Sequence, residues 1–292
     1  MPAQTIKDST RLWFAVMTDT SRKVALVTGA SRGIGKATAI MLAEAGYDVA
    51  VSARTVHEGD GRSDTDGVVL PGSLDTTVGA IDAAGTEGFA VRMDVLDRQS
   101  LLEGVEAVMQ RFGRIDVLVN NAIYQGYGTM VEFADLLEED LHRIFEGNVY
   151  AQLALIRTVL PQMIARNAGT IVNMISATAY QDPPARIGNG GWGMGYAMSK
   201  AALARVAPLL HRELEDYDIR VFSVDPGFVV TEKTEAVGRA AQFSQHYKPA
   251  TPPVIGAAIR WLVEDREADT LRGQIVMAQR ETKRRSLLPG WP

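Results

Sequence analysis

Short apolar runs alternate with longer amphipathic segments from residue 22 onward. The first five runs are almost continuously apolar, whereas a strand with one solvated face would alternate apolar and polar residues. A continuous run is typical of parallel strands that are buried on both faces. We expect seven strands, at residues 24–27, 49–51, 89–93, 115–119, 170–175, 219–224 and 274–277.

The segments between the strands carry helix signals. The first helix has an apolar face around Ile34 and Leu42, and Gly46 follows it as a C-terminal stop. Ser73 is placed as the N-cap of the second helix. This alternation predicts an α/β fold: one doubly wound domain over residues 22–280, with a parallel sheet and helices on both faces. Further helices are expected at about 98–112, 138–166, 196–216 and 253–264.

Some segments lie outside this alternation. We expect residues 1–21 to form a flexible N-terminal extension, although a functional arm docked on the domain is the alternative. Residues 281–292 are expected to form a C-terminal tail. Two polar or glycine-rich stretches, 55–71 and 177–195, are expected to be long loops. Long loops in compact domains are often functional, and we favour a functional role for the second.

The composition excludes several classes of protein. Thirty Lys and Arg residues against 35 Asp and Glu residues give a formal net charge of −5, without a basic cluster for nucleic acid. The chain has no cysteine and its four histidines lie far apart, so we expect no disulfide and no metal centre. No apolar stretch reaches the length of a membrane span, and the first residues do not resemble a secretion signal. We therefore expect a cytoplasmic protein without a membrane or nucleic-acid partner.

A glycine-rich sequence, TGASRGIG, follows the first strand and opens the first helix. Gly29 permits a tight turn, Gly33 lets the backbone approach a pyrophosphate, and Gly35 allows the helix to pack closely on the strand. The helix N-terminus then presents free N–H groups and a partial positive charge to the phosphates. We predict a dinucleotide site here. The alternative is a glycine-rich turn without a ligand.

The second strand ends without the acidic residue that usually binds the ribose 2′-hydroxyl of NAD. Arg54 follows instead, and Arg32 lies within the glycine-rich turn. Two guanidinium groups favour a 2′-phosphate, because they form charge-assisted bidentate bonds with it. We expect NADP(H) in preference to NAD(H). The alternative is that both arginines are solvated surface residues.

Tyr196 and Lys200 lie four residues apart, on one face of an expected helix. An ammonium group beside a phenol lowers the pKa of the phenol, so that the tyrosine can exchange a proton near neutral pH. Other polar residues point to the same site. Ser176 follows the fifth strand, Asn148 lies in an otherwise apolar helix, and Asn120 ends the fourth strand.

In their order along the chain, TGASRGIG, NNA, the Asn148 helix, Ser176, YAMSK and DPGFVVTE resemble the motifs of the short-chain dehydrogenase/reductase family over about residues 22–278. The resemblance implies a single Rossmann-type domain with strand order 3-2-1-4-5-6-7 and NAD(P) at the carboxyl ends of the strands. It implies that Tyr196 is the general acid/base and that Lys200 holds the nicotinamide ribose and favours the phenolate. Ser176 would bind the substrate oxygen, and Asn148 would anchor a proton-relay water.

The same resemblance implies a set of cofactor contacts. Asp94 and Val95 would meet the adenine, and the segment that starts at Pro226 would line the nicotinamide. The complete expected set is Gly29, Ser31, Arg32, Gly33, Ile34, Gly35, Arg54, Asp94, Val95, Asn120, Ala122, Tyr196, Lys200, Pro226, Gly227, Val229 and Thr231.

The chain departs from the family pattern at four places. Ile123 follows NNA where the family usually has glycine, and Asp225 precedes Pro-Gly where asparagine is usual. The segment between Ser176 and Tyr196 is longer than the family norm. The last strand ends in VMAQRE and lacks the frequent Asp-Gly-Gly.

These features predict an NADP(H)-dependent oxidoreductase that transfers hydride between nicotinamide and a carbonyl or alcohol substrate. The alternative is a catalytically idle NADP(H)-binding sensor or scaffold, which the intact set of catalytic residues disfavours. The family resemblance, together with apolar residues on several faces of the helices expected at 138–166 and 196–216, predicts a homo-oligomer, either a tetramer or a dimer.

Aromatic and apolar residues are expected around the substrate. They favour a medium-sized apolar ketone or alcohol, although they could instead pack on one another. The candidates are Tyr124, Tyr127, Tyr180, Trp192, Met194 and Phe228.

Overall fold

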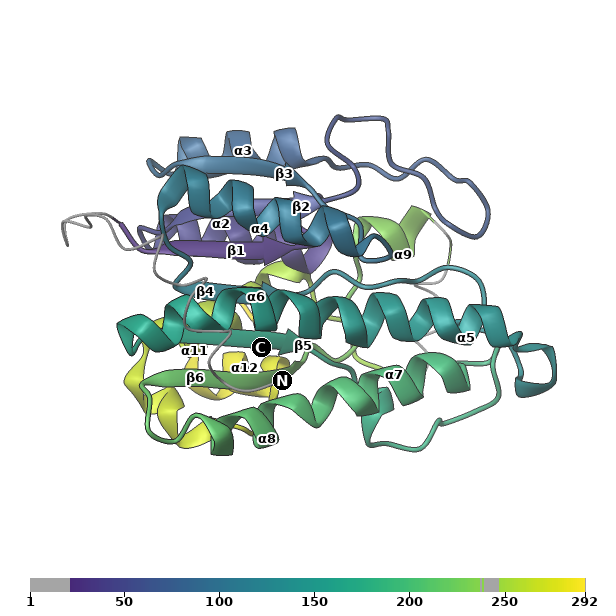
Figure 1. The fold of residues 1–292 in the computed structure, drawn as a ribbon. Coiled ribbons are helices and arrows are strands. Elements are labelled where there is room, and N and C mark those ends of the chain that lie inside the picture. Colours follow the sequence, from purple (N-terminus) through teal and green to yellow (C-terminus); the bar gives the residue numbers. More distant parts are fainter. Residues whose placement is uncertain (1–21, 237, 239–246, 292) are drawn as a thin grey trace, which may run out of the picture.

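The computed structural model describes residues 22–236, 238 and 247–291. Seven strands form one parallel sheet in the order β3-β2-β1-β4-β5-β6-β7, as the family resemblance implied (Figure 1). The strands are β1 (Val24–Thr28), β2 (Asp48–Ala53), β3 (Gly88–Arg92), β4 (Val117–Asn120), β5 (Gly169–Met174), β6 (Ile219–Asp225) and β7 (Ile275–Met277).

The strand order reverses at β1. The chain runs outward from β1 to β3 and then returns to β4, which pairs with the other edge of β1. All five residues of β1 are buried, as expected for a strand covered on both faces. A crevice forms at the carboxyl ends of the strands where such a reversal occurs, and doubly wound sheets bind their ligands there.

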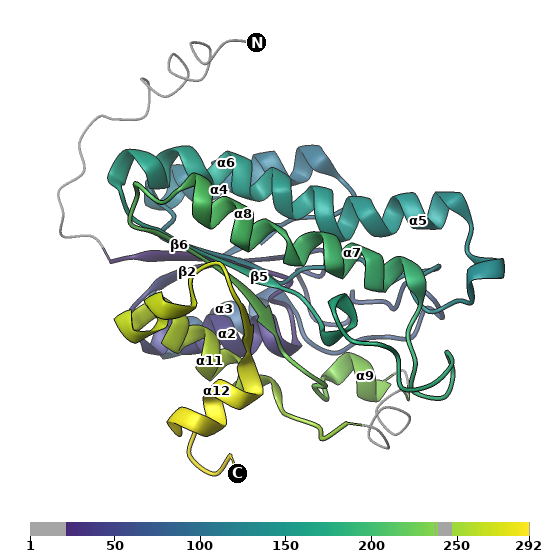
Figure 2. The same ribbon diagram turned by 90° about the horizontal axis from the view of Figure 1, so that it is seen from below.

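Helices cover both faces of the sheet (Figure 2). The helices are α2 (Gly33–Glu44), α3 (Leu74–Ala83), α4 (Arg98–Phe112), α5 (Glu138–Phe145), α6 (Ala151–Arg166), α7 (Met194–Ala204), α8 (Val206–Glu213), α9 (Glu232–Ala236), α11 (Pro252–Glu264) and α12 (Ala278–Arg285). One layer holds α2, α3, α11 and α12, whose apolar side chains share a core with Ala25 and Val27 of β1. The other layer includes α4, α6 and α8, which pack on Val24 and Leu26 from the opposite face of that strand. The predicted doubly wound α/β fold is confirmed.

Two of the expected helices are divided. The helix expected at 138–166 contains a π-helical turn, η3 (Glu146–Tyr150), between α5 and α6. The helix expected at 196–216 begins at Met194 and breaks at Arg205, where α7 gives way to α8. A π turn adds a single residue to one helical turn, so it leaves the apolar periodicity almost unchanged and does not show in the sequence pattern.

The segment expected to be a C-terminal tail is folded onto the domain. The boundary expected at residue 280 falls within α12, where the Thr282 hydroxyl donates to the Val254 carbonyl at 2.7 Å. Leu287 and Trp291 then pack against the core. The sequence of α12 is rich in charged residues, so it has little apolar periodicity to indicate a helix. Residues 1–21, where we expected a flexible extension, lie outside the described residues.

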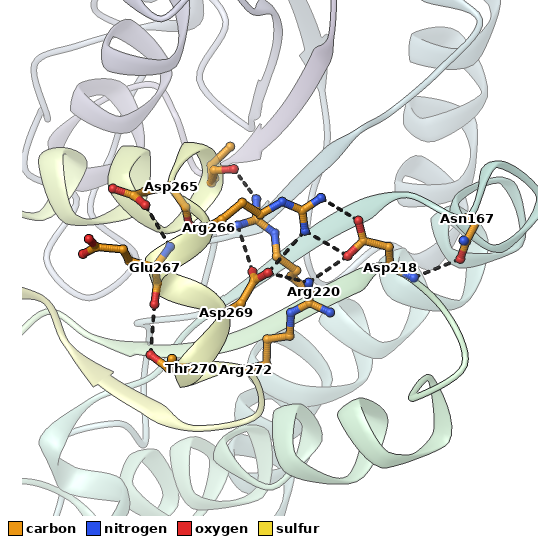
Figure 3. Close-up of polar contacts among 10 residues, drawn as sticks. Asn167, Asp218, Arg220, Asp265, Arg266, Glu267, Asp269, Thr270 and Arg272 are labelled. Carbon is orange, nitrogen blue, oxygen red and sulfur yellow. Dashed lines mark hydrogen bonds and ion pairs between the residues drawn. The ribbon is translucent and has the colours of Figure 1, made fainter.

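A network of ion pairs ties the start of β6 to the segment that follows α11 (Figure 3). Arg266 and Arg272 bind the Asp218 carboxylate at 2.6 and 2.7 Å, and the hydrogen bond from Arg266 in particular holds the pKa of Asp218 far below its usual range. Arg220, which is buried, faces Asp269 at 3.5 Å. This network lies at the amino ends of the strands, opposite the crevice, and joins β6 to the C-terminal part of the fold.

Candidate active site

The glycine-rich turn after β1 has a shape that requires glycine. Gly29 and Gly33 have φ values of +66° and +57°, in the left-handed region. A Cβ atom on Gly35 would lie 2.4 Å from the Gly29 carbonyl oxygen, well inside van der Waals contact. Asn121, at the end of β4, fixes the turn because its side-chain amide donates to the carbonyls of Thr28 and Gly29. Asn121 belongs to the NNA motif but was not among the expected site residues.

A carboxylate lies at the N-terminus of α2. The Gly33 N–H donates to Glu232 Oε2 at 2.9 Å, and the N-cap residue Arg32 makes no side-chain cap of its own. Free N–H groups and the helix dipole make this end of α2 an anion site. Glu232 directly follows Thr231, an expected nicotinamide contact. No local sequence signal indicated this contact, because it joins residues that lie far apart in the chain.

The two arginines expected to bind a 2′-phosphate are held by the loop of residues 55–71 and its neighbour Gly72. Arg54 forms a bidentate pair with Asp64, with both distances 2.8 Å, and this hydrogen bonding raises the pKa of Arg54. Arg32 donates to the carbonyls of Pro71 at 2.8 Å and Gly72 at 2.9 Å. Arg32 is thus held by backbone carbonyls, whereas Arg54 lies at the surface, with 45% of its side chain exposed, and is paired with Asp64. A 2′-phosphate would reach Arg54 by sharing it with Asp64 or by displacing that carboxylate.

A small, mainly apolar hollow lies where the adenine was expected, and Asp94 is not among its lining residues. Val95 and Ala122 line it, together with residues at the carboxyl ends of β1 and β2. Asp94 precedes Val95, but one of its carboxylate oxygens accepts from the Leu96 N–H at 3.0 Å. The hollow therefore presents mainly apolar surface, and its cavity volume of 10 Å³ is close to that of a single water molecule.

Three expected cofactor residues are turned mainly into the protein. The Asn120 side chain is buried and donates to the Asn173 side chain at 2.9 Å, between β4 and β5. Ser31 is buried within the turn, and Ile34 packs against the core. The Asn120 amide thus joins two strands below the crevice.

The segment expected on the nicotinamide side is held by the C-terminal helix. Pro226 and Gly227, whose φ is +65°, form a turn directly after β6. The Gln279 side chain in α12 donates to two backbone carbonyls of this turn, at 2.9 and 3.0 Å. Val229 is buried, and Thr231 directly precedes α9. Gln279 was not predicted, because it lies beyond every motif on which the family resemblance rests.

The π-helical turn places Asn148 inside the site. Asn148 is fully buried, and its Oδ1 accepts from the Tyr124 N–H at 2.7 Å. Its Nδ2 donates to the Ser199 hydroxyl at 3.2 Å, which in turn donates to the Tyr196 carbonyl at 2.8 Å. One buried amide therefore connects the segment after β4 to the helix that carries the candidate acid/base.

Tyr196, Lys200 and Ser176 meet at the carboxyl edge of the sheet. Lys200 is buried, with its Nζ 5.9 Å from the centroid of the Tyr196 ring, and it donates to the Met174 carbonyl at 2.7 Å. Ser176 stands at the expected position after β5, where it begins the short 3₁₀ turn η4 (Ala177–Ala179). A hydrogen bond between the Ser176 and Tyr196 side chains contributes to the protonation equilibrium of the phenol.

Burial dominates the protonation of this group. It lowers the pKa of Lys200 to about 7 and raises the pKa of Tyr196 to about 12. The Ser176 hydrogen bond lowers the pKa of Tyr196, and the negative charge of Asp225 raises it. The pKa of Tyr196 is therefore raised, whereas the sequence predicted a lowered value beside Lys200, because desolvation disfavours both the ammonium and the phenolate.

The candidate pocket residues lie in different surroundings. Tyr124 is buried, whereas Tyr127 is exposed and donates its hydroxyl proton to the Thr65 carbonyl at 2.9 Å. The rings of Phe228 and Tyr247 lie 6.5 Å apart, centroid to centroid. Tyr127 thus connects the loop of residues 55–71 to the segment after β4.

The loop of residues 177–195 packs against the segment that follows Tyr127. Arg186 pairs with Glu132 at 2.7 Å, and a Cβ atom on Gly193 would lie 2.4 Å from the Thr129 carbonyl oxygen. Trp192 is partly buried within the loop, and Met194 is exposed where α7 begins. The loop leads directly into the helix that carries Tyr196.

Comparison with known proteins agrees with this geometry. The family model "short chain dehydrogenase" matches residues 23–64 and 68–242. The 3-oxoacyl-[acyl-carrier-protein] reductase FabG of Staphylococcus epidermidis is 33% identical over 218 residues, which cover 74% of this chain and 78% of that protein. The enzyme of the same name from Thermotoga maritima is 31% identical over 265 residues, 87% of this chain and 95% of its own.

Solved structures give the same result. A putative short-chain alcohol dehydrogenase from Sinorhizobium meliloti superposes with a TM-score of 0.72 at 29% identity, covering 89% of this chain and 96% of that one. A short chain dehydrogenase from Mycobacterium paratuberculosis, solved bound to NAD, gives 0.71 at 26% identity, with 88% and 96% covered. The chain belongs to the short-chain dehydrogenase/reductase family. It is an NAD(P)-dependent oxidoreductase that acts on carbonyl or alcohol groups.

The residues present fit a nicotinamide dinucleotide. The glycine turn admits no Cβ at Gly35, and the Glu232 carboxylate shows that the N-terminus of α2 can hold an anion.

Within the described residues, no cluster of three or more His, Asp or Glu side chains is arranged to hold a metal ion. In the same part of the chain, no helix is both long and apolar enough to span a membrane.

Proposed function

We propose that this chain is an NADP(H)-dependent carbonyl reductase or alcohol dehydrogenase in which Tyr196 is the general acid/base. The observation that carries the proposal is the assembly of Tyr196, Lys200, Ser176 and Asn148 at the carboxyl edge of the sheet, beside the anion site of α2. Four polar side chains from three separate segments converge there, which packing alone does not require.

Each residue has a role that its position supports. When bound, the nicotinamide dinucleotide supplies or accepts the hydride. The Ser176 hydroxyl holds the substrate oxygen next to the Tyr196 phenol. The raised pKa keeps Tyr196 protonated, so it can give its proton to the oxygen as negative charge develops there. Lys200 holds the ribose and supports the phenolate, and Asn148 anchors the relay that returns the proton.

The preference for NADP(H) is supported by the end of β2. Ala53 is the last residue of that strand, and Arg54 follows where an acid would bind the 2′-hydroxyl of NAD. Arg54 and Arg32 would hold the 2′-phosphate, and the turn of Gly29, Gly33 and Gly35 would hold the pyrophosphate. The relative solved with NAD differs from this chain at about three-quarters of the aligned positions, so its ligand does not decide between the two cofactors.

The substrate is proposed to be a small-molecule carbonyl or alcohol of medium size. The FabG relatives carry the name of a 3-oxoacyl reductase, and Tyr124, Tyr180 and Phe228 bring aromatic surface near the site.

We further propose a homo-oligomer, a dimer or tetramer, located in the cytoplasm. Exposed apolar side chains gather on η3, on α6 to α8 and just before α5, and they would be covered by a second subunit. They are Leu137, Tyr150, Leu153, Met194, Met198 and Leu209.

The test is a spectrophotometric assay of the purified full chain. Oxidation of NADPH and of NADH is followed with a panel of steroid, fatty-acyl, aromatic and sugar-type carbonyls. Turnover of at least one class, with a lower KM for NADPH than for NADH, is expected. Tight binding of NADPH without turnover of any carbonyl or alcohol would instead favour a cofactor-binding sensor or scaffold.

A further inference from the structure

A helix follows the last strand directly and reaches the crevice. The sequence departs there from the family pattern, because VMAQRE stands where Asp-Gly-Gly is frequent. Strand β7 ends at Met277, and α12 begins at the next residue, Ala278. Met277 is paired with Asp225, the last residue of β6, so the first turn of α12 lies beside the turn that follows β6. Gln279 belongs to that first turn of the helix.

The Gln279 side chain holds the turn after β6. Its Nε2 donates to the Pro226 carbonyl at 2.9 Å and to the Phe228 carbonyl at 3.0 Å, so both donors of the amide are used. Between these two residues, Gly227 has a φ of +65°, and a Cβ atom there would lie 2.5 Å from Gln279 Nε2. The glycine thus leaves the space that the amide occupies. Asp225 Oδ1 also accepts from the Gly227 N–H, at 2.8 Å.

The helix that carries Gln279 is itself anchored. The buried Thr282 hydroxyl donates to the Val254 carbonyl of α11 at 2.7 Å. The Arg285 guanidinium lies 3.9 Å from the centroid of the Trp261 ring, which is also on α11. A group on a packed helix is held more precisely than one on a free loop, so α12 is a firm support for the turn.

The turn begins a segment that connects the catalytic group to the anion site. At its start, the Val224 carbonyl of β6 accepts from the N–H of Ile175, the residue before Ser176, at 2.8 Å. At its end, the Glu232 carboxylate accepts from the Gly33 N–H at 2.9 Å. A dinucleotide with its pyrophosphate at the N-terminus of α2 and its nicotinamide at the catalytic group would therefore run along this segment.

The remainder of the segment does not depend on Gln279. The Val230 N–H donates to the Ala250 carbonyl at 2.9 Å, and the Ala250 N–H donates to the Phe228 carbonyl at 2.9 Å. Loss of the Gln279 amide should therefore free the turn at Pro226 and leave the part of the segment near α2 in place.

We propose that Gln279 is a positioning residue for the nicotinamide half of the cofactor: by holding the carbonyls of Pro226 and Phe228, it fixes the backbone against which the nicotinamide ring lies. Gln279 acts through this turn. The inference rests on the proposed function only in that a nicotinamide dinucleotide binds in the crevice, and it requires no turnover.

The test compares two ligands that differ in the nicotinamide base. NADP carries the base, whereas 2′-phospho-ADP-ribose has the same phosphates and sugars without it. Gln279→Leu removes both hydrogen bonds with little change in volume. We expect the Kd for NADP to rise about tenfold, the scale of one or two hydrogen bonds, while the Kd for 2′-phospho-ADP-ribose stays within about twofold. Both are measured by calorimetry on the full chain.

Two further variants complete the design. Gln279→Glu keeps the shape of the side chain but replaces the NH₂ donor with an oxygen, so it should show the same selective loss even if the leucine variant is unstable. Gln274→Leu is the matched control, because Gln274 is exposed, lies before the opposite end of β7 and also donates to a backbone carbonyl, that of Thr270 at 2.9 Å. It should change neither Kd. Thermal unfolding checks that each variant is folded.

Two outcomes would overturn the inference. Equal losses for the two ligands in the Gln279 variants would show that α12 supports the domain as a whole and not the nicotinamide side. Wild-type Kd values for both ligands would show that the turn keeps its place without the amide.

The result is separable from the proposed function. A selective loss of NADP affinity supports the inference even in a chain that reduces no carbonyl, whereas equal losses overturn it even in an active enzyme. If NAD binds more tightly than NADP, the same comparison is made with NAD and ADP-ribose. A chain that binds neither dinucleotide would overturn both the inference and the proposed function.

Discussion

The carboxylate of Glu232 accepts a hydrogen bond from the backbone N–H of Gly33, a residue that lies 199 positions earlier in the chain. This contact places an internal anion at the helix end that the glycine-rich turn prepares for a pyrophosphate. The carboxylate and a phosphate would compete for the same N–H group. A pyrophosphate that takes the Gly33 N–H group would therefore displace Glu232 from it.

Neutralising this internal anion should improve cofactor binding. Glu232→Gln weakens the contact with the N-terminus of α2, and a charge at such a place contributes about 0.3–1 kcal/mol. We expect the Kd for NADPH to fall by about two- to fivefold, measured by isothermal titration calorimetry at low salt. Glu235→Gln, at an exposed position of the same short helix, is the matched control. Weaker binding in Glu232→Gln would show that the carboxylate assists the cofactor.

Two further predictions concern the binding of the cofactor's 2′-phosphate. Arg54→Asp removes a guanidinium partner and places a negative charge beside the phosphate, so the Kd for NADPH should rise at least about tenfold more than that for NADH. Asp64→Asn frees Arg54 from its carboxylate partner and should tighten NADPH binding while leaving NADH binding unchanged. Both are measured by quenching of intrinsic fluorescence.

The control for Arg54→Asp is Arg212→Asp, which makes the same charge change at a side chain that is 80% exposed on α8. Equal losses for NADPH and NADH in Arg54→Asp would place Arg54 away from the 2′-phosphate.

Removing the candidate proton donor should stop the chemistry and spare the cofactor. Tyr196→Phe keeps the ring and its packing but deletes the hydroxyl group, so kcat should fall at least about 100-fold while the Kd for NADPH stays within about twofold. Steady-state kinetics and calorimetry measure the two quantities. Tyr217→Phe, at an exposed tyrosine, is the control. Near wild-type turnover in Tyr196→Phe would mean that the proton comes from another group.

Burial of Lys200 should make stability depend on pH. The pKa of Lys200 is about 7 in the folded chain and about 10.4 when unfolded. Between these values the unfolded chain binds more protons, so the free energy of unfolding rises with pH over this window. Below about pH 7 the lysine is protonated in both states, and the cost of burying its charge is fully present.

This dependence is measured by urea unfolding of the cofactor-free chain at about pH 7 and about pH 9, with Lys200→Met as the comparison. The increase from low to high pH should be smaller in Lys200→Met, because Met carries no proton to lose. The unfolding measurements are kept below about pH 10, the pKa of an unperturbed tyrosine. Above it Tyr196, whose pKa is raised to about 12, begins to lose its own contribution to stability, with the opposite sign. Parallel pH profiles for the two proteins would contradict the prediction.

The exposed apolar side chains on α6 to α8 should be covered in solution. Light scattering at micromolar concentration is expected to give the mass of a dimer or tetramer. Leu153→Glu, which places a charge on α6, should lower that mass, because an interface core does not tolerate an unpaired charge. Val69→Glu introduces the same charge at another exposed apolar residue and should leave the mass unchanged. A monomeric wild-type chain would refute the prediction.

The sequence by itself determined the features that depend on local order. TGASRGIG fits one kind of strand–turn–helix junction, because its glycines adopt φ values and close contacts that other residues do not. The four-residue spacing of Tyr196 and Lys200 places both on one face of a helix, whatever lies around it. Continuous apolar runs indicated strands buried on both faces, and their alternation with helices indicated the doubly wound sheet.

The tertiary structure alone decided what lies opposite each of these features. Glu232 reaches Gly33 and Asp64 reaches Arg54, and no periodicity in the sequence indicates either contact. Asp225 was visible in the sequence only as a departure from a motif, and the fold brings its carboxylate to the Tyr180 hydroxyl. Burial decided the protonation of Tyr196 and Lys200, because desolvation depends on every element that packs around them. Motifs identify groups that can do chemistry, whereas the surrounding fold determines their charge and their partners.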